Sequence, residues 1–256
     1  MPVSQSDHVR AFGESESAAG SPAIEARTNA INWTKVYADL DVQGWAVASN
    51  LLTHAEADDI VRLYHGERIF RSHIIMARHG FGRGNYKYFR YPLPRLIHSL
   101  RTTAYAHLAP IANRWHERMG KEACFPPEHA AFLERCHQAG QVRPTPLLLE
   151  YEPEDYNCLH RDLYGEHVFP MQIAILLDQP GEDFEGGEFV MTEQRPRMQS
   201  RVMVLPLRKG DAAIFAVNSR PMTGVRGDYS VKMNHGVSKI RSGKRHVIGV
   251  IFHDAL

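Results

Sequence analysis

The second half of the chain alternates between short apolar runs and turn signals, and this pattern limits the fold more than any other feature. After Pro146, runs rich in aliphatic residues are separated by turn sequences such as Pro180-Gly181, Gly186-Gly187 and Lys209-Gly210-Asp211. Many short strands with regular turns are typical of a β-sandwich or barrel. The predicted strands are Leu147–Tyr151, Met171–Leu177, Gly187–Met191, Arg201–Pro206, Ala212–Val217 and His246–Phe252.

The first half of the chain predicts mainly helices. Thr53 and Glu56 have the spacing of a capping box at a helix start. A long helix is predicted from about Pro94 to Met119 and a shorter one over Glu128–Gln138. Residues 70–91, rich in Arg, aromatic residues and Gly, predict either a hairpin or a long loop facing the substrate.

Together these elements predict an α+β chain in which N-terminal helices support a β-core. Residues 1–30 are rich in Ser, Ala, Glu and Gly and show no apolar periodicity, so we expect a disordered tail. Residues 31–256 are then expected to form a single domain. Residues 31–146 would supply mainly helical support, and residues 147–256 the β-core with any functional site.

The formal net charge of +1 does not commit the chain to nucleic acid or to a membrane. Charge is unevenly distributed, because residues 147–194 hold twelve acidic residues and one basic one, whereas residues 195–256 hold twelve basic and three acidic ones. A basic surface is therefore to be sought in the second block. Within it, Arg195, Arg197 and Arg201 either line a groove for a phosphate backbone or belong to a solvated hairpin.

Cysteine content and hydropathy indicate the cellular setting. Cys124, Cys136 and Cys158 are an odd and widely spaced set without a CxxC pair, so we expect buried, reduced thiols. No apolar run approaches the roughly 18 residues of a membrane span. The first residues lack the pattern of a secretion signal. We therefore expect a cytoplasmic protein.

The segment His160-Arg161-Asp162 carries the first candidate functional residues. In extended backbone, side chains two residues apart point to the same side, so His160 and Asp162 would present an imidazole and a carboxylate together. His235 would complete a set of two His and one carboxylate. This set suits ferrous iron and leaves three coordination positions open, two for a bidentate oxo-acid and one for dioxygen. An H-x-D tripeptide alone is weak evidence in a chain with fifteen His.

Arg245 strengthens this interpretation. It lies ten residues after His235 and begins the strand-like run Arg245–Phe252. A fixed guanidinium near a metal can bind the far carboxylate of a dicarboxylic co-substrate in bidentate fashion. The competing interpretation of Arg245 is a solvated surface charge.

The order of these motifs resembles the Fe(II)/2-oxoglutarate-dependent dioxygenases of the prolyl-hydroxylase and AlkB-like type. Phe184–Phe189 resembles the glycine-turn strand that follows the H-x-D strand in such enzymes, and Pro206–Phe215 resembles their later turn and strand. The resemblance implies a double-stranded β-helix, or jelly-roll, core. It also implies that Tyr151, nine residues before His160, hydrogen-bonds 2-oxoglutarate.

A narrower resemblance concerns the substrate. Asp162–Pro170 and Thr192–Arg201 are similar to a bacterial oxygenase family proposed to demethylate damaged DNA bases oxidatively. The resemblance implies that Fe(II) is held by His160, Asp162 and His235. It also implies that 2-oxoglutarate meets Arg245 and Tyr151, and that O2 is consumed with release of succinate and CO2.

Several alternatives remain open at this point. The substrate of such an oxygenase would be an alkylated nucleobase, a protein side chain such as proline, or a small molecule. A non-catalytic metal-binding β-barrel is a different class of protein, and a zinc hydrolase using the same three ligands is another. Arg245 distinguishes them, because neither alternative needs an anchor for a dicarboxylate.

Overall fold

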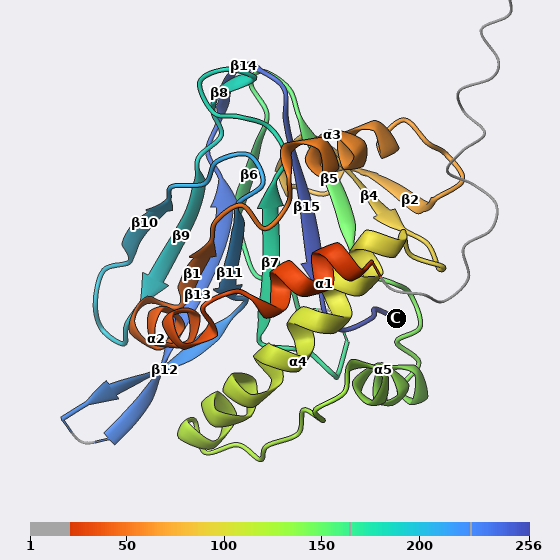
Figure 1. Cartoon of the computed structure of the whole chain (residues 1–256). Coiled ribbons are helices and arrows are strands. Elements are labelled where there is room, and N and C mark those ends of the chain that lie inside the picture. Colours follow the sequence, from red (N-terminus) through yellow and green to blue (C-terminus); the bar gives the residue numbers. More distant parts are fainter. Residues whose placement is uncertain (1–20, 164, 226) are drawn as a thin grey trace, which may run out of the picture.

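Two antiparallel sheets face each other, and helices cover the outer face of the larger one (Figure 1). The computed structural model describes residues 21–163, 165–225 and 227–256. The larger sheet has the strand order β1 (Trp45–Ala48), β11 (Ala212–Ala216), β7 (Met171–Leu176), β15 (Arg245–Ile251), β5 (Leu147–Tyr151), β4 (Asn85–Phe89) and β2 (Phe70–Ile75). The helices are α1 (Pro22–Asn29), α2 (Trp33–Gln43), α3 (His54–Leu63), α4 (Arg95–Arg118) and α5 (His129–Gln138), with a 3₁₀ turn at Met76–Arg78.

The smaller sheet has the strand order β10 (Arg201–Leu205), β9 (Phe189–Gln194), β13 (Gly227–Val237), β6 (Tyr156–His160) and β3 (Gly82–Arg83). β12 (Ser219–Gly224) forms a hairpin with β13, and β14 (Ile240–Gly243) pairs with β8 (Phe184–Gly186). The two sheets enclose a space, and the alternation of side chains along a strand directs every second one into it. The predicted α+β class is confirmed.

The three central strands of the larger sheet are buried along their whole length. Every residue of β7, β11 and β15 is buried, because helices cover one face and the smaller sheet covers the other. The 24-residue helix α4 contributes Leu100, Leu108 and Trp115 to the same core. One cluster of buried apolar side chains extends from Ile24 to Phe252, so helices and strands share a core.

Most predicted elements are present within one or two residues. The capping box of Thr53 and Glu56 forms, and the two predicted helices correspond to α4 and α5. The hairpin alternative for residues 70–91 is confirmed, since β2 pairs with β4. The strand predicted from Gly187 begins instead at Phe189, because Gly186 and Gly187 both have positive φ and form a turn.

The predicted disordered tail is wrong for residues 22–29, which form α1. Ile24 and Thr28 are fully buried, and Ser99 of α4 accepts a hydrogen bond from the backbone N–H of Ser21 at 2.6 Å. These contacts with α4 stabilise a helix whose own sequence shows almost no amphipathic pattern. The rest of the predicted tail, residues 1–20, lies outside the described residues.

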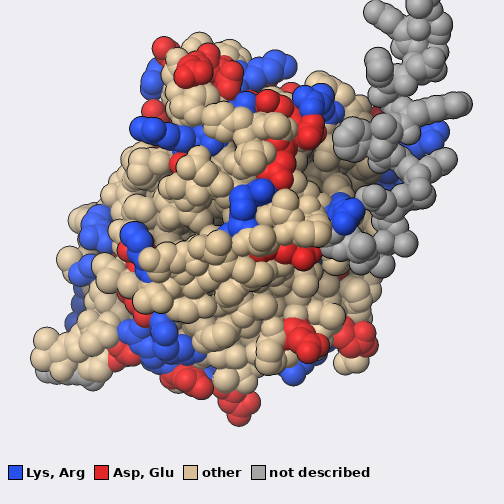
Figure 2. Space-filling model, in the orientation of Figure 1, with Lys and Arg blue, Asp and Glu red and all other residues tan. Residues whose placement is uncertain are grey.

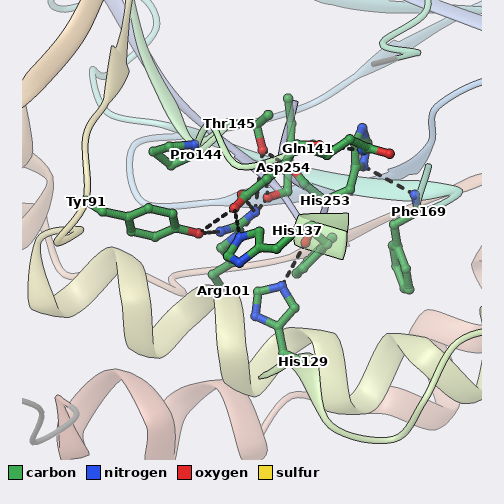
Figure 3. A network of polar contacts seen from close by, with 12 residues as sticks. Tyr91, Arg101, His129, His137, Gln141, Pro144, Thr145, Phe169, His253 and Asp254 are labelled. Atoms are coloured by element: carbon green, nitrogen blue, oxygen red, sulfur yellow. Dashed lines mark hydrogen bonds and ion pairs between the residues drawn. The ribbon is translucent and has the colours of Figure 1, made fainter. Parts of the chain in front are cut away.

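A buried polar network attaches the last strand to the helices (Figure 3). The guanidinium of Arg101 on α4 pairs with Asp254 at 2.8 Å, and both side chains are almost fully buried. Tyr91 donates to the same carboxylate, and His137 of α5 contacts it, each at 2.9 Å. The network therefore fixes the chain just beyond β15 against α4 and α5. Within the described residues, no helix is both long and apolar enough to cross a membrane.

Candidate metal centre and co-substrate pocket

The structure brings His160, Asp162 and His235 together. His160 ends β6, and the β13–β6 ladder places His235 directly opposite it. The potential ligand atoms all lie within 4.8 Å of one another. His160 Nε2 is 3.5 Å from Asp162 Oδ1, and His235 Nε2 is 3.4 Å from Asp162 Oδ2. Two imidazole nitrogens and one carboxylate, converging from one side, fit the donor set of a ferrous iron centre with open positions.

The protonation states of Asp162 and His235 suit metal binding, whereas the hydrogen bond and charge of Asp162 outweigh burial and raise the pKa of His160. Burial alone would raise the pKa of Asp162, but its hydrogen bonds with His160 and His235 outweigh burial and hold that pKa well below its usual range. Burial lowers the pKa of His235, which favours the neutral ring. His160 Nδ1 lies 2.8 Å from the backbone carbonyl of Cys158 and donates to it, so Nε2 keeps its lone pair.

Gln172 is a site residue that the sequence analysis missed. It lies on β7, and its Nε2 donates to Asp162 Oδ2 at 2.9 Å and lies 3.2 Å from His235 Nε2. The side chain is buried and lines the same cavity. The sequence does contain a sign of Gln172, because it is the one polar residue in the apolar run Met171–Leu177. A polar side chain in a buried strand needs a polar partner, which points to a site.

Arg245 lies in the same cavity, which has a volume of about 210 Å³ and lies between the two sheets. Its side chain is 1% exposed, and its Nε and Nη1 make no hydrogen bond with the described residues. Burial lowers the pKa of Arg245 to about 10. A buried cation with unsatisfied donors is costly unless an anion accompanies it. The structure therefore provides a place for a carboxylate at this end of the cavity.

Tyr151 borders the same end of the cavity. It is the register partner of Arg245 in the β15–β5 ladder, and the guanidinium carbon lies 5.6 Å from the centre of its ring. Its hydroxyl accepts a hydrogen bond from Asn157 Nδ2 at 3.4 Å. Burial raises the pKa of Tyr151 to about 12, so the hydroxyl keeps its proton and can also donate.

Two glycines leave room for this pair of side chains. A Cβ at Gly187 would lie 2.7 Å from Arg245 Cδ, and a Cβ at Gly84 would lie 2.8 Å from the ring of Tyr151. Both glycines also have positive φ, which other residues rarely adopt. The Gly-rich stretches near residues 84 and 187 therefore shape the co-substrate end of the cavity.

The structure favours one interpretation of the basic residues near 195–201 and corrects the prediction about the thiols. Arg195 and Arg201 lie 2.9 Å and 3.5 Å from the buried carboxylate of Glu193, on the hairpin of β9 and β10, which agrees with the solvated-hairpin interpretation. Of the three cysteines, only Cys136 is buried, so the prediction is wrong for the other two: Cys124 is exposed in the connection between α4 and α5, and Cys158 is exposed on β6. His246 faces Asp178 and Glu150, away from Arg245 and the cavity.

Comparisons with known proteins agree with this architecture. Two uncharacterized Mycobacterium tuberculosis proteins, MT2286 of strain CDC 1551 and Rv2227 of strain H37Rv, are each 46% identical to this chain over 167 residues. The match covers 65% of this chain and 72% of theirs. Residues 84–255 match the Oxygenase-NA family model, which is described as an oxygenase catalysing oxidative methylation of damaged DNA.

Solved structures with the same fold are much more distant in sequence. A prolyl-4-hydroxylase from Pseudomonas putida has a TM-score of 0.51 at 14% identity, with 88% of this chain and 99% of that chain covered. A Trichoplax adhaerens prolyl hydroxylase in complex with a hypoxia-inducible-factor peptide has a TM-score of 0.52 at 13% identity, with 91% and 92% covered. A Burkholderia pseudomallei oxidoreductase of the 2OG-Fe(II) oxygenase family has a TM-score of 0.50 at 12% identity, with 88% and 92% covered.

The fold is thus that of the 2-oxoglutarate- and Fe(II)-dependent oxygenases. More narrowly, the chain belongs to the Oxygenase-NA family, whose model spans residues 84–255 and so includes all three members of the His–Asp–His cluster. The predicted oxygenase class is confirmed.

Proposed function

We propose that this chain is an Fe(II)- and 2-oxoglutarate-dependent oxygenase that removes methyl groups from damaged nucleobases by hydroxylating them. One observation carries the proposal: the buried guanidinium of Arg245, two nitrogens of which lack a hydrogen-bond partner among the described residues, shares a cavity with the His160–Asp162–His235 cluster. A metal-binding module or a zinc hydrolase would have no use for this cation. A dicarboxylate that bridges a metal and Arg245 would satisfy it.

The residues of the chain have distinct roles in this proposal. His160, Asp162 and His235 would hold iron, and Gln172 would fix the orientation of the Asp162 carboxylate. Arg245 would bind the far carboxylate of 2-oxoglutarate, and the Tyr151 hydroxyl would donate to it. Leu149, Val247 and Phe189 line the cavity and exclude water from it. When bound, iron and 2-oxoglutarate together supply the oxidising power, drawn from O2, for hydroxylating a C–H bond.

The proposed substrate is a base with an N-methyl group. Hydroxylation breaks one C–H bond of the methyl group and forms one C–O bond. The C–N bond of the resulting hydroxymethyl group then breaks, formaldehyde leaves, and the hydroxyl proton passes to the nitrogen. One atom of O2 enters this hydroxyl group, and the other enters succinate as CO2 is released. The description of the Oxygenase-NA family, which names damaged DNA, supports this substrate class. An oxygenase supplies oxidation, which removes a methyl group and does not add one.

Turnover with a defined oligonucleotide tests this function. The protein is incubated with Fe(II), 2-oxoglutarate, O2 and an oligonucleotide containing one N-methylated base, and succinate and formaldehyde are measured. We expect equal amounts of both products, and an unmethylated oligonucleotide should yield no formaldehyde. Succinate without formaldehyde would leave an oxygenase with a different substrate, and a proline-containing peptide is the comparison to use then. The same proposal includes a cytoplasmic location and one domain, which was predicted to begin at residue 31 and to which α1 also belongs because Ile24 lies in its core.

A further inference from the structure

Two of the three candidate metal ligands are recessed from the surface, and this limits the form in which a base can reach them. Asp162 is 7% exposed and His235 is 5% exposed, and both lie on the wall of the cavity between the sheets, whereas the side chain of His160 is 34% exposed. A base that stays paired and stacked in a duplex cannot enter such a cavity. Enzymes that act on a base inside a pocket take it from a single strand or turn it out of the helix.

The margin of this cavity carries exposed apolar side chains. Phe81 is 47% exposed and also lines the cavity, and Leu159 and Leu163, at 52% and 49%, flank the His160–Asp162 segment. Tyr156 is 38% exposed on β6. The pairing of β3 with β6 places the backbone of Phe81 beside β6, since Phe81 O accepts from the backbone N–H of Cys158 at 3.0 Å. We call Phe81, Tyr156, Leu159 and Leu163 the rim.

The rim offers flat rings for stacking. The rings of His79 and Phe81 stack on each other, with centroids 5.3 Å apart and an interplanar angle of 22°. His79 is also exposed. Stacking on aromatic side chains is the main way in which proteins bind unpaired bases without regard to sequence. An exposed apolar group of this kind at a cavity mouth marks an interaction site.

Positive charge lies beside the rim. Arg161 is exposed, borders the cavity and donates to Asn218 Oδ1 at 3.3 Å. The side chain of Arg83 is 57% exposed although it lies 3.7 Å from Asp155. The two other acids of the β5–β6 turn are paired elsewhere, Glu152 with Lys244 at 2.7 Å and Glu154 with Lys239 at 3.0 Å. The margin therefore offers two exposed cations, of which Arg83 shares the carboxylate of Asp155 and Arg161 bonds to an uncharged amide.

Figure 2 shows the helix-covered face, where acidic and basic side chains of the described residues are interspersed. The basic residues of the block 195–256 therefore do not form a continuous basic surface on that face. Local cations beside the cavity mouth are better placed to attract a phosphate backbone.

We propose that the rim, with Arg83 and Arg161, binds a single-stranded stretch of nucleic acid and directs one unpaired base into the cavity. This inference rests on the proposed function for its substrate class, and it adds the strandedness of the substrate and the residues that select it. Bases next to the target stack on Phe81 and Tyr156. Phosphates contact Arg83 and Arg161, and the apolar Leu159 and Leu163 cover the sugar and base edges.

Binding is measured by fluorescence anisotropy with the protein, Fe(II) and 2-oxoglutarate under argon, so that no turnover occurs. The probes are a labelled single-stranded oligonucleotide with one N-methylated base and the same oligonucleotide annealed to its complement. We expect the single strand to bind at least tenfold more tightly than the duplex. Phe81→Ala should weaken single-strand binding about tenfold. Arg161→Gln should weaken it too and should reduce the slope of log K against log salt by about 0.7.

Two control variants match these changes at exposed positions outside the rim. Val202→Ala removes an apolar side chain that is 62% exposed on β10, and Arg197→Gln removes an exposed cation at the β9–β10 turn. Both should bind the single strand within twofold of the unmodified protein. Tighter binding of the duplex, or equal loss in the rim and control variants, would overturn the inference.

Competing occupants of the rim give different results. If a second copy of the chain covers the rim, light scattering will show a dimer that Leu159→Glu dissociates, and the inference fails. If a proline-containing peptide displaces the oligonucleotide, the rim is a peptide site and the inference also fails. Succinate formation is measured separately. If the protein forms succinate but does not prefer the single strand, this inference fails and the proposed oxygenase chemistry stands.

Discussion

The side-chain amide of Gln172 donates to Oδ2 of Asp162 at 2.9 Å, whereas His160 contacts the other oxygen, Oδ1, of this carboxylate. Groups that orient metal ligands typically change metal affinity by 10–100-fold when removed. Gln172→Leu should therefore weaken Fe(II) binding by roughly tenfold or more. Anaerobic calorimetric titration measures this affinity, and Gln138→Leu on the surface of α5 is the control. Equal affinities in both variants would show that Gln172 is only a packing residue.

Gly187 and Gly181 form a matched pair for testing the Arg245 pocket. Both have positive φ, but a Cβ at Gly187 would lie 2.3 Å from Ile240 Cδ1 and 2.7 Å from Arg245 Cδ, whereas a Cβ at Gly181 would meet nothing within 4 Å. Alanine at either position should cost about 1–2 kcal/mol of backbone strain. Only Gly187→Ala should also displace Arg245 and raise the KM for 2-oxoglutarate, by about tenfold. A normal KM in Gly187→Ala would show that Arg245 does not bind the co-substrate.

His246 predicts a pH dependence of stability. Hydrogen bonds and charge interactions with Asp178 and Glu150 outweigh its burial and raise its pKa to about 9, above the unfolded value of about 6.5. Its contribution is fully present below pH 6.5, because both states are then protonated. It is lost as pH rises toward 9, where the folded state also releases its proton. The free energy of unfolding should fall by on the order of 2 kcal/mol across this window.

Urea denaturation at intervals from pH 6 to pH 9.5 measures this change. His246→Gln carries no titrating group at this position, so its unfolding free energy should vary much less over the same range. A parallel decline in both proteins would assign the pH dependence to other groups.

The buried pair of Arg101 and Asp254 should matter far more to stability than an exposed pair. Asp254→Asn leaves the 2%-exposed guanidinium of Arg101 without its counter-charge and should cost about 3–5 kcal/mol. Asp39→Asn breaks an exposed i,i+4 pair with Lys35 and should cost less than about 1 kcal/mol. Chemical denaturation of the two variants compares these costs. Similar losses would mean that the network in Figure 3 contributes little to the attachment of β15.

The sequence predicted those parts of the site that a local pattern encodes. His160 and Asp162 are two residues apart in extended backbone, and Arg245 begins an apolar strand, so spacing alone indicates how they point. Gln172 was missed because its partners lie 10 and 63 residues away, and only the pairing of strands brings them together.

The same physical distinction explains the elements that were missed. α1 forms through contacts with α4, some seventy residues away, and not through its own periodicity. The glutamate that neutralises Arg195 lies two residues earlier, but its burial depends on Arg220, 27 residues later. Local sequence could not show that this cation is paired, because the acid that pairs it is held by a distant strand.

The most direct measurement of the central claim is the anaerobic absorption spectrum of the protein with Fe(II) and 2-oxoglutarate. We predict a metal-to-ligand charge-transfer band that Asp162→Ala abolishes and that Arg245→Met shows only at roughly 100-fold higher 2-oxoglutarate, because the buried anchor for the far carboxylate is lost. Admission of O2 should then bleach the band and release succinate. Iron binding without any such band in the unmodified protein would contradict the account, since iron and 2-oxoglutarate would not meet in this cavity.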